Sequence, residues 1–417
     1  MKNYHNIITI ILAIVTITCT SSQGLSTIAN NKPSSSSAPT IDIISLIEQV
    51  NQTTLLTYLE DLLAFGTRPT TSAACNNASL YISNELTSMG LSVRKQNWTH
   101  NTTMYSTNIE ATIPGLRPNN PLIFILNTHY DCWPGSPGAD DNGAAVAAAL
   151  TIARILSTHS FNNTIKFVFP SGQEQGLLGT TYYIQEANAR HEPIAGVINA
   201  DFIGYATTTS NGNKIKLYDN SQSRWLTAFT DGTADKYKDY IGLDAIPSGN
   251  NANYSDQLKY WAQGFNAIFC REYQFTPNAH TPQDSLENMN VTYATKVCKL
   301  LIATLAELGN SDLQIPLLYI DTISGGFGVH TSVMNVGTST ATDINWTIAV
   351  TGKTIFIGKI STGVLAQIEP GTSAQIHSRF ILGFGAANLT ITAGAKTKTG
   401  QASVFLCFVY QPLNTTS

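Results

Sequence analysis

The chain has 417 residues, of which 43% are hydrophobic and 12% are charged, and its formal net charge at pH 7 is −4. This length predicts about two or three domains with a sizeable hydrophobic core, and the charged share is about half of the usual value. The weak negative charge and the lack of a basic patch in the sequence argue against a nucleic-acid partner.

The N-terminus has the features of an export signal. Lys2 precedes an apolar stretch over residues 7–17, which is too short to span a bilayer, and small polar residues follow it. We therefore expect residues 1–22 to be a cleaved signal peptide and residues 23–40, rich in Ser, Asn and Pro, to be a flexible leader. The mature chain is then secreted or at the cell surface, without a transmembrane span. Lipidation at Cys19 is a less favoured alternative.

Sequons and cysteines also bear on secretion. Dense Asn-x-Ser/Thr sequons suit a secreted glycoprotein, although a chain rich in Asn and Thr also forms them by chance. They begin at Asn51, Asn77, Asn97, Asn101, Asn162, Asn253, Asn290, Asn345, Asn388 and Asn414. The cysteines after the signal are odd in number and form no CxxC pair, so neither a disulfide scaffold nor a cysteine-held structural zinc is expected.

Helices and strands alternate through most of the chain. Apolar residues at helical spacing predict helices over residues 41–65, 72–89, 143–157, 180–189, 223–236, 256–263 and 292–308. Short apolar or alternating runs predict strands over residues 91–98, 107–113, 122–126, 165–169, 195–198, 214–217 and 266–269. This alternation predicts an α/β sheet that helices cover on both faces.

After Gly309 the helical pattern stops. Residues 315–411 contain strand-like runs separated by turns rich in Gly, Asn and Thr. They predict a small C-terminal all-β sandwich, which has few Asp, Glu or His residues and to which we assign no chemistry. The expected folded domains are therefore residues 41–310 and residues 311–417.

Acidic and histidine residues follow four of the predicted strands. In chain order they are His129 and Asp131, Glu174, Asp201 and His280. Asp141 joins them at the start of a helix. If the strands are parallel, these side chains meet at one edge of the sheet, where open α/β sheets bind ligands. Each residue alone is better explained as a helix cap, a turn residue or a loop residue. Together, five oxygen and nitrogen ligands fit two metal ions about 3.5 Å apart, bridged by one carboxylate.

The order and spacing of these residues resemble a known family. The motifs are His129-x-Asp131, Gly138-Ala139-Asp140-Asp141-Asn142, Glu174-x-Gly176-Leu177-x-Gly179, Asn199-x-Asp201-x-Ile203-Gly204, Ser255-Asp256 and His280-Thr281-x-x-Asp284. Through them, residues 54–309 resemble the zinc-dependent exopeptidases that include bacterial leucyl aminopeptidase, aminopeptidase Y and glutamate carboxypeptidase, with glutaminyl cyclase as a relative. The resemblance implies a central mixed, mostly parallel sheet of about eight strands between helix layers.

The resemblance also implies a centre with two zinc ions per chain. His129 and Asp201 would bind one ion, and Glu174 and His280 would bind the other. Asp141 would bridge the two ions. Zinc lowers the pKa of a bound water toward about 7, so such a centre suits hydrolysis of a peptide bond.

Two positions beside these ligands bear on catalysis. Asp131 would hold the ring of His129. The family usually has two successive glutamates, the first as general base and the second as ligand. In this chain Gln173 occupies the position of the base and Glu174 that of the ligand. A neutral amide does not accept a proton from water, and its presence should lower the rate on the order of 100- to 10,000-fold. Gln257 likewise stands where many relatives have His.

The substrate pocket is less marked in the sequence. We expect Trp133, Ile203 and Tyr254 to line it, which suits an apolar N-terminal residue, with packing in the core or rim as the competing interpretation. Arg271 is a candidate to bind an acidic substrate or, equally, to pair with Glu272. The sequence therefore predicts a secreted zinc aminopeptidase acting on peptides. The alternative is an impaired relative that binds zinc and peptide N-termini.

Overall fold

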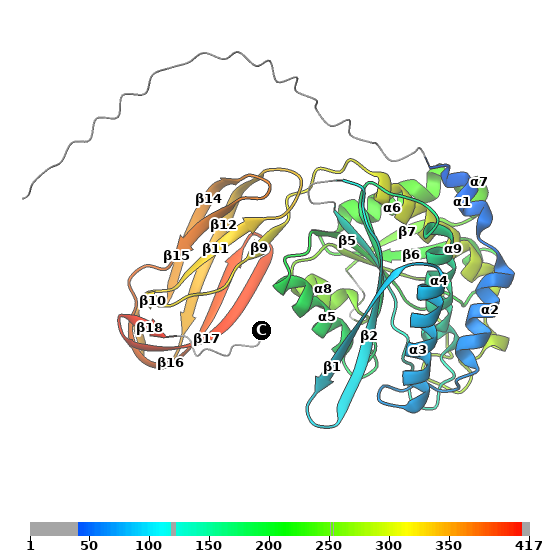
Figure 1. The fold of residues 1–417 in the computed structure, drawn as a ribbon, viewed down its shortest axis with the longest axis horizontal. Helices are drawn as coiled ribbons and strands as arrows, with labels where there is room; N and C mark the ends of the chain where they lie inside the picture. The colour runs from blue at the N-terminus through cyan, green and yellow to red at the C-terminus, as the bar shows by residue number, and fades with distance from the viewer. Residues whose placement is uncertain (1–40, 118–121, 251, 253, 411–417) are drawn as a thin grey trace, which may run out of the picture. The chain divides into compact units, whose positions relative to one another are not determined.

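The computed structural model describes residues 41–117, 122–250, 252 and 254–410. The predicted signal peptide and leader lie outside these residues. Helices and strands alternate up to the end of α9 at Asn310, and within the described residues only strands follow. Figure 1 shows these two parts, which we call the α/β part and the β part.

Most helices begin close to the predicted positions, but the stretch 41–65 forms two helices separated at Val50 and Asn51, and the short helix Lys238–Ile241 was not predicted. The helices are α1 (Ile43–Gln49), α2 (Gln52–Leu63), α3 (Ala73–Ser88), α4 (Ala144–Leu156), α5 (Leu178–Ala189), α6 (Arg224–Lys236), α7 (Lys238–Ile241), α8 (Gln257–Ala262) and α9 (Val291–Asn310), with short turns η1 (Ala139–Gly143), η2 (Asn211–Asn213) and η3 (Leu286–Asn288). The side chains of Asp42, Asn51, Ser72 and Asn290 accept backbone N–H groups at the starts of α1, α2, α3 and α9. Such caps satisfy N–H groups that a helix start leaves without partners.

The α/β part has one mixed sheet of eight strands. They are β1 (Ser92–His100), β2 (Met104–Ile113), β3 (Ile123–Asn127), β4 (Thr164–Phe169), β5 (Ile194–Ala200), β6 (Lys214–Tyr218), β7 (Asp244–Gly249) and β8 (Ala267–Glu272). Their order is β1-β2-β4-β3-β5-β8-β6-β7. The four central strands β4, β3, β5 and β8 run parallel, and antiparallel pairs join β1, β2 and β6 to them. The predicted fold is therefore confirmed.

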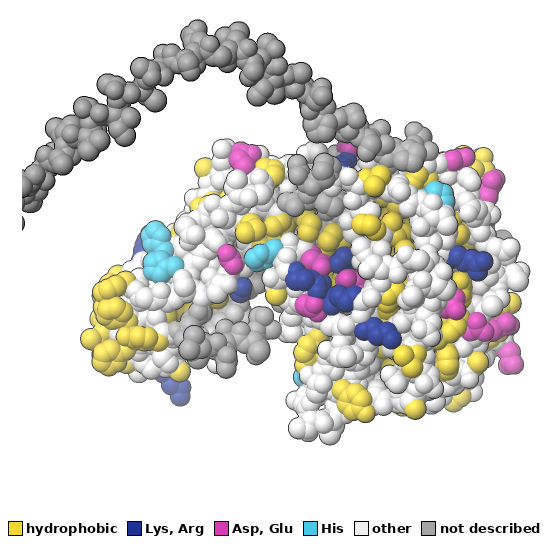
Figure 2. Space-filling view, in the orientation of Figure 1, with side chains coloured by type: hydrophobic (Ala, Val, Ile, Leu, Met, Phe, Trp, Pro, Cys, Tyr) yellow, Lys and Arg dark blue, Asp and Glu magenta, His cyan; other side chains and the backbone are white. Residues whose placement is uncertain are grey.

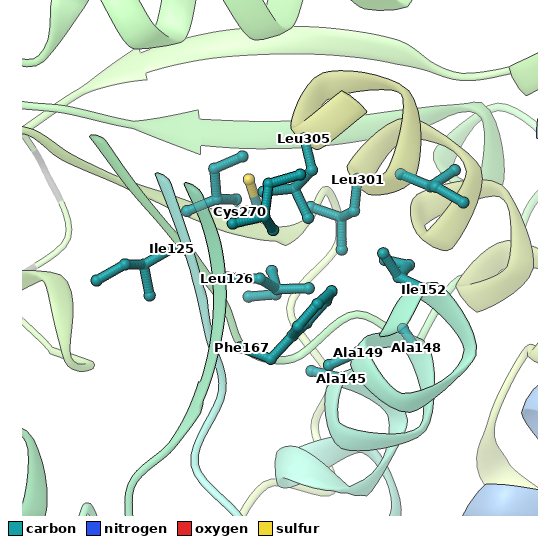
Figure 3. Packing of buried hydrophobic residues seen from close by; sticks show 14 of the residues in the cluster. Ile125, Leu126, Ala145, Ala148, Ala149, Ile152, Phe167, Cys270, Leu301 and Leu305 are labelled. Atoms are coloured by element: carbon teal, nitrogen blue, oxygen red, sulfur yellow. The ribbon is translucent and has the colours of Figure 1, made fainter. Parts of the chain in front are cut away.

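Helices cover both faces of this sheet, because the central strands are apolar on both sides. Every residue of β3, β4, β5 and β8 is buried. Figure 1 shows α4 and α9 on one face and α5 and α8 on the other. Small side chains of α4, including Ala145, Ala148 and Ala149, let this helix approach the sheet closely beside Phe167 (Figure 3). The core thus fixes the ends of the central strands, where the polar residues lie.

The β part consists of antiparallel strands in two sheets. They are β9 (Leu318–Ile320), β10 (Gly326–Phe327), β11 (His330–Asn335), β12 (Ala341–Thr351), β13 (Ile355–Ile357), β14 (Ile360–Ile368), β15 (Ser373–His377), β16 (Leu382–Ala393), β17 (Lys396–Leu406) and β18 (Phe408–Tyr410). One sheet has seven strands and the other three. Residues of both sheets, such as Val333 and Ile348, share one hydrophobic cluster, as expected for the predicted sandwich.

One strand of the large sheet was not predicted. β7 forms the edge of the sheet and contains Pro247 and Gly249. These residues interrupt a strand pattern, but an edge strand tolerates them because one side needs no ladder hydrogen bonds.

Figure 2 shows that charged side chains are sparse on the visible face, with one mixed group of basic and acidic residues. No helix among the described residues is both long and apolar enough to cross a membrane.

Candidate metal centre

The five predicted ligands come from the carboxyl edge of the sheet. His129 follows β3, Glu174 follows β4, Asp201 directly follows β5 and His280 lies in the loop after β8. Asp141 lies in η1, at the start of α4. Since β4, β3, β5 and β8 are parallel neighbours, the loops after them reach the same edge. The sequence places these residues up to 151 positions apart, and the topology brings them together.

The ligand atoms form two groups that share Asp141. In one group, Nε2 of His129 lies 3.4 Å from Oδ1 of Asp141 and 3.4 Å from Oδ1 of Asp201. In the other, Nε2 of His280 lies 3.1 Å from Oδ2 of Asp141 and 3.3 Å from Oε2 of Glu174. The candidate ligand atoms of each group lie within 4.8 Å of one another. Asp141 thus offers one carboxylate oxygen to each group.

One of these oxygens lacks the partner that burial requires. Oε1 of Glu174 is buried and has no hydrogen-bond partner within the described ranges. The two buried carboxylate oxygens of Asp141 face the ring nitrogens of His129 and His280, at 3.4 and 3.1 Å. A buried polar atom without a partner costs about 1–3 kcal/mol. Imidazole nitrogen and carboxylate oxygen are donors that zinc uses in proteins. The residues present therefore fit bound zinc.

The electrostatics of the cluster also favour a cation. Hydrogen bonds to Asp141 and Glu174 raise the pKa of His280 to about 10. Burial disfavours a charge on His129, but Asp201 and the neighbouring carboxylates outweigh it and hold its pKa well above the ordinary value. Burial raises the pKa of Glu174 to about 7. Positive charge is thus stabilised between these side chains, and a divalent cation would supply it.

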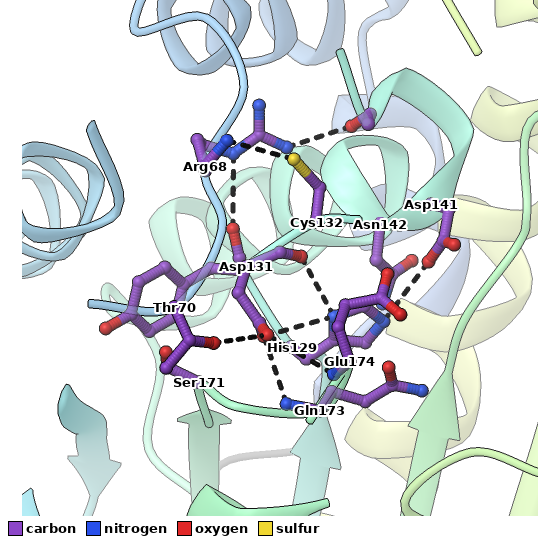
Figure 4. Close-up of polar contacts among 12 residues, drawn as sticks. Arg68, Thr70, His129, Asp131, Cys132, Asp141, Asn142, Ser171, Gln173 and Glu174 are labelled. Carbon is purple, nitrogen blue, oxygen red and sulfur yellow. Dashed lines mark hydrogen bonds and ion pairs between the residues drawn. The ribbon is translucent and has the colours of Figure 1, made fainter. Parts of the chain in front are cut away.

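Asp131 supports both groups of ligands (Figure 4). Nδ1 of His129 lies 3.1 Å from the backbone oxygen of Asp131 and 3.5 Å from its Oδ1. The carboxylate of Asp131 also accepts the hydroxyl of Thr70 at 2.8 Å and the backbone N–H groups of Gln173 and Glu174, each at 3.3 Å. Asp131 therefore orients the loop that carries Glu174 as well as the ring of His129, a wider role than the sequence predicts.

Two residues hold the loop before Asp141. The carboxylate of Asp284 accepts the backbone N–H of Asp140 at 2.7 Å and that of Asp141 at 3.2 Å. Arg68 is fully buried and donates to backbone oxygens of this loop, namely those of Tyr130, Pro137 and Gly138. Sequence reasoning gave Asp284 no role and missed Arg68. Arg68 lies 73 positions before Asp141 in no motif, so only the fold reveals its contacts.

Left-handed backbone gathers around the same site. Leu177, Phe202, Ser255 and His280 have φ angles of 63°, 54°, 73° and 60°. Such a conformation costs a residue other than glycine on the order of 1–3 kcal/mol, and it concentrates at functional sites. His280 is itself a proposed ligand, Leu177 and Phe202 lie within three positions of one, and the hydroxyl of Ser255 contacts Asp201. The packed sheet ends hold the backbone in these conformations.

Gln173 lies beside the ligands, at the position where the sequence departs from the family. Its backbone oxygen accepts the N–H groups of Gly176 at 3.1 Å and Leu177 at 3.0 Å, which fixes the turn. Figure 4 shows its side-chain amide near Glu174. The fully buried Gln257 instead accepts a hydrogen bond from Asn199 at 3.3 Å and donates to the backbone oxygen of Tyr254 at 2.7 Å, so its amide supports the loop that carries Tyr254.

The three proposed pocket residues have different environments. The ring of Trp133 stacks on that of His280 with a centroid distance of 4.5 Å and remains 41% exposed. Tyr254 is 37% exposed and has an edge contact with Phe269. Ile203 has no exposed surface and packs in the hydrophobic core. Trp133 and Tyr254 therefore offer surface to a substrate, whereas Ile203 supports the loop from beneath.

Comparisons with known proteins point to the same family. Residues 108–305 match peptidase family M28. Aminopeptidase YwaD of Bacillus subtilis is 29% identical over 203 residues, which cover 46% of this chain and 43% of that protein. A probable leucine aminopeptidase of Arthroderma benhamiae is 28% identical over 222 residues, 49% of this chain and 58% of that protein. The matched region thus spans about half of the length of these relatives.

Solved structures share the fold. The zinc aminopeptidase BSAP of Bacillus subtilis superposes with a TM-score of 0.56 at 16% identity, covering 63% of this chain and 96% of that chain. The LapA aminopeptidase of Legionella pneumophila gives a TM-score of 0.58 at 18% identity, covering 64% of this chain and 75% of that chain. The resemblance to the zinc-dependent exopeptidases is therefore confirmed, and the matching family is peptidase family M28.

Proposed function

We propose that this chain is a secreted zinc aminopeptidase with two ions, which removes N-terminal residues from peptides. The observation that carries the proposal is the pair of ligand groups that share Asp141, whose two buried carboxylate oxygens face the ring nitrogens of His129 and His280, one in each group. His129 and Asp201 would hold one ion, and Glu174 and His280 the other. The relatives named leucine aminopeptidase support the choice of a free N-terminus as substrate.

The chain's own residues would position the reacting groups. Bound zinc would polarise the scissile carbonyl and activate a water molecule. Asp131 fixes the imidazole of His129 and, through the backbone N–H of Glu174, the loop that carries this ligand. Trp133 packs on His280 and keeps its ring in one orientation. These contacts hold the ligand atoms in place before a substrate arrives, which lowers the cost of reorganisation during the reaction.

Gln173 favours a second candidate function, that of an impaired peptidase that binds zinc and peptide N-termini. The neutral amide can donate a hydrogen bond to a substrate or accept one, but it cannot carry the proton from water to the leaving amine. In the first candidate, another group takes over this proton or turnover is slow. The two candidates share the metal centre and differ only in the proton carrier.

The deciding experiment compares zinc-loaded wild type with Gln173→Glu on aminoacyl chromogenic substrates, with bound zinc measured in both. If Gln173 limits turnover, the variant should gain on the order of 100- to 10,000-fold in rate. Gln175→Glu, two positions further along the same loop, adds the same charge away from the base position and should gain little. An active wild type with little gain in Gln173→Glu would show that another group carries the proton. If neither protein binds zinc, the proposal fails.

Secretion is part of the proposal and is supported by the export signal and the sequons. The asparagines of six sequons are exposed, as glycosylation requires: Asn51, Asn77, Asn97, Asn101, Asn345 and Asn388. Expression in a secretory eukaryotic host should yield a protein in the medium whose N-terminus follows residue 22. Treatment with an N-glycosidase should then increase its electrophoretic mobility. If the protein stays in the cells with residues 1–22 still attached, this prediction is wrong.

A further inference from the structure

Arg271 is a buried cation without an acidic partner. It lies near the end of β8 and is 8% exposed. Among the described residues no carboxylate forms an ion pair with it, and the rest of the sequence contains no Asp or Glu. A buried charge is normally paired, because its removal from water is costly. The contacts of Arg271 must therefore show what stabilises its buried charge in place of a carboxylate.

The neighbouring Glu272 is not that partner. Its carboxylate accepts the backbone N–H of Tyr205 at 2.8 Å and that of Thr276 at 2.6 Å. Arg271 reaches only its backbone oxygen, through Nε at 3.4 Å. The ion pair considered from the sequence is thus replaced by two backbone contacts of Glu272, and the guanidinium of Arg271 points elsewhere.

Aromatic rings surround the guanidinium instead. Its central carbon lies 4.9 Å from the ring centroid of Phe275, 5.3 Å from that of Tyr218 and 5.9 Å from that of Tyr254. Ring faces stabilise a cation without neutralising it. Nη1 donates to the hydroxyl of Tyr254, and the two N–H groups of Nη2 have no acceptor within the described ranges. The rings thus hold the guanidinium in place, and no group of the described residues takes up the donors of Nη2, which suits a ligand.

The strand register places Arg271 beside the candidate metal centre. The backbone N–H of Asp201 donates to Cys270 at 3.2 Å, and that of Glu272 donates to Phe202 at 2.8 Å. Arg271 therefore lies next to Asp201 across neighbouring parallel strands, which are about 5 Å apart. Ser255, which follows Tyr254, donates its hydroxyl to Oδ2 of Asp201 at 2.5 Å. The aromatic group around Arg271 is thus continuous with the ligand shell.

We propose that Arg271 closes the pocket for the N-terminal side chain and selects an acidic residue, glutamate or aspartate. This inference rests on the proposed function and names its substrate class. Free N–H donors of a guanidinium suit the two oxygens of a carboxylate, which they bind side by side. An apolar side chain would bury the same donors without a partner, so the pocket rejects it. Of the two preferences considered from the sequence, this proposal therefore favours the acidic one.

Binding of non-hydrolysable probes tests the inference without relying on turnover. The probes are the α-hydroxamates of L-glutamate, L-glutamine and L-leucine, titrated calorimetrically into zinc-loaded protein. They share the zinc-binding group and lack an α-carboxylate, so a difference between glutamate and glutamine reports on the side-chain charge. A charged hydrogen bond is worth about 1.5–3 kcal/mol, so wild type should bind the glutamate probe about 10- to 100-fold more tightly than the glutamine probe.

Three variants locate the effect. Arg271→Met should lose the preference for glutamate and retain or improve binding of the leucine probe. Arg271→Lys keeps the charge but not the planar donors, and should retain a smaller preference. Lys216→Met removes an equal charge from the residue opposite Arg271 in the β6–β8 pair, and should change the preference little. Thermal unfolding of each variant shows that it is folded.

The outcomes separate this inference from the proposed function. If wild type binds the leucine probe as tightly as the glutamate probe, the role of Arg271 is overturned and the peptidase site stands. If Lys216→Met and Arg271→Met lose the preference for the glutamate probe equally, the preference comes from the overall positive charge. The role of Arg271 is then also overturned. If wild type binds no probe although zinc is present, the proposed function itself fails.

Discussion

Two clusters of charged side chains lie on the same sheet, each with a buried centre, and their charges are balanced in different ways. One, the edge network, joins β1, β2, β4, α5 and the turn after α5, and it consists of Arg94, Glu110, Lys166, Glu186, Arg190 and Glu192. It has equal numbers of basic and acidic side chains. The candidate metal centre joins the carboxylates of Asp141, Glu174 and Asp201 with the imidazoles of His129 and His280, and among the described residues none of these carboxylates forms an ion pair with Lys or Arg.

The difference shows how each cluster meets the cost of buried charge. In the edge network Lys166 lies 3.1 Å from Glu110 and 2.9 Å from Glu192, so the chain supplies its own counter-ions. In the metal centre, Oε1 of Glu174 has no hydrogen-bond partner in the described chain, and the oxygens of Asp141 face imidazole nitrogens rather than Lys or Arg. A network that is complete within the chain stabilises the fold, whereas an incomplete one is suited to a ligand.

The largest effect that separates the clusters concerns Asp141. Asp141→Asn removes the carboxylate that both ligand groups share, and we expect zinc affinity to fall by more than about 100-fold, since even supporting residues of metal sites are worth 10- to 100-fold. Glu192→Gln, in the edge network, is the matched control and should bind zinc normally. Zinc content after dialysis against a weak chelator measures both. Equal zinc retention in Asp141→Asn and wild type would show that the cluster is not a metal site.

The next largest effect is the loss of folding stability when the shared cation of the edge network is removed. Lys166→Met leaves Glu110 and Glu192 without their shared cation, and breaking a buried pair in this way costs about 3–5 kcal/mol. Urea unfolding of the metal-free protein measures the loss. In the double variant Lys166→Met/Glu110→Gln the uncompensated charge is reduced, so part of the stability should return. An additive loss in the double variant would mean that the two residues act independently.

The sequence predicts the metal centre better than the edge network, and the reason is physical. Four of its residues follow predicted strands, so an apolar run in the sequence indicates where each one lies: His129, Asp131, Glu174 and Asp201. Their order along the chain also matches that of the family motifs. No sequence pattern of this kind indicates which charged residues of the edge network pair with one another. Its members come from separate elements and are paired by the antiparallel register of β1, β2 and β4, which apolar spacing alone does not give.

Positions within the pocket show a similar limit. The sequence suggests Ile203 as a lining residue, but the side chain turns into the core. It leaves Arg271 between two interpretations, because the partner of a charged residue depends on the direction of its side chain. Only the packed structure shows that Glu272 is occupied by backbone N–H groups. Element type and strand ends are thus readable from the sequence, and side-chain pairing is not.

The smallest of these effects is the pH dependence of the edge network. Burial opposes ionisation of Glu110, but hydrogen bonds and charges of Arg94 and Lys166 outweigh it and lower its pKa to about 2, from an ordinary value of 4.5. A carboxyl group with a lowered pKa stabilises the fold above the pKa of the unfolded chain. This stabilisation, at most about 3 kcal/mol, is lost as the pH falls from about 4.5 through about 2.

Comparison with Glu110→Gln isolates this contribution. Both proteins are unfolded in urea without metal at several pH values between 6 and 2.5, so that titration of the metal centre affects both equally. The stability advantage of wild type should be constant above about pH 5 and shrink steadily below it. Zinc binding at pH 7 should be the same in both, because the network and the metal centre share no ligand. A constant advantage down to pH 2.5 would mean that Arg94 and Lys166 do not stabilise the ionised carboxylate, and the balance between the two clusters would have to be explained by packing alone.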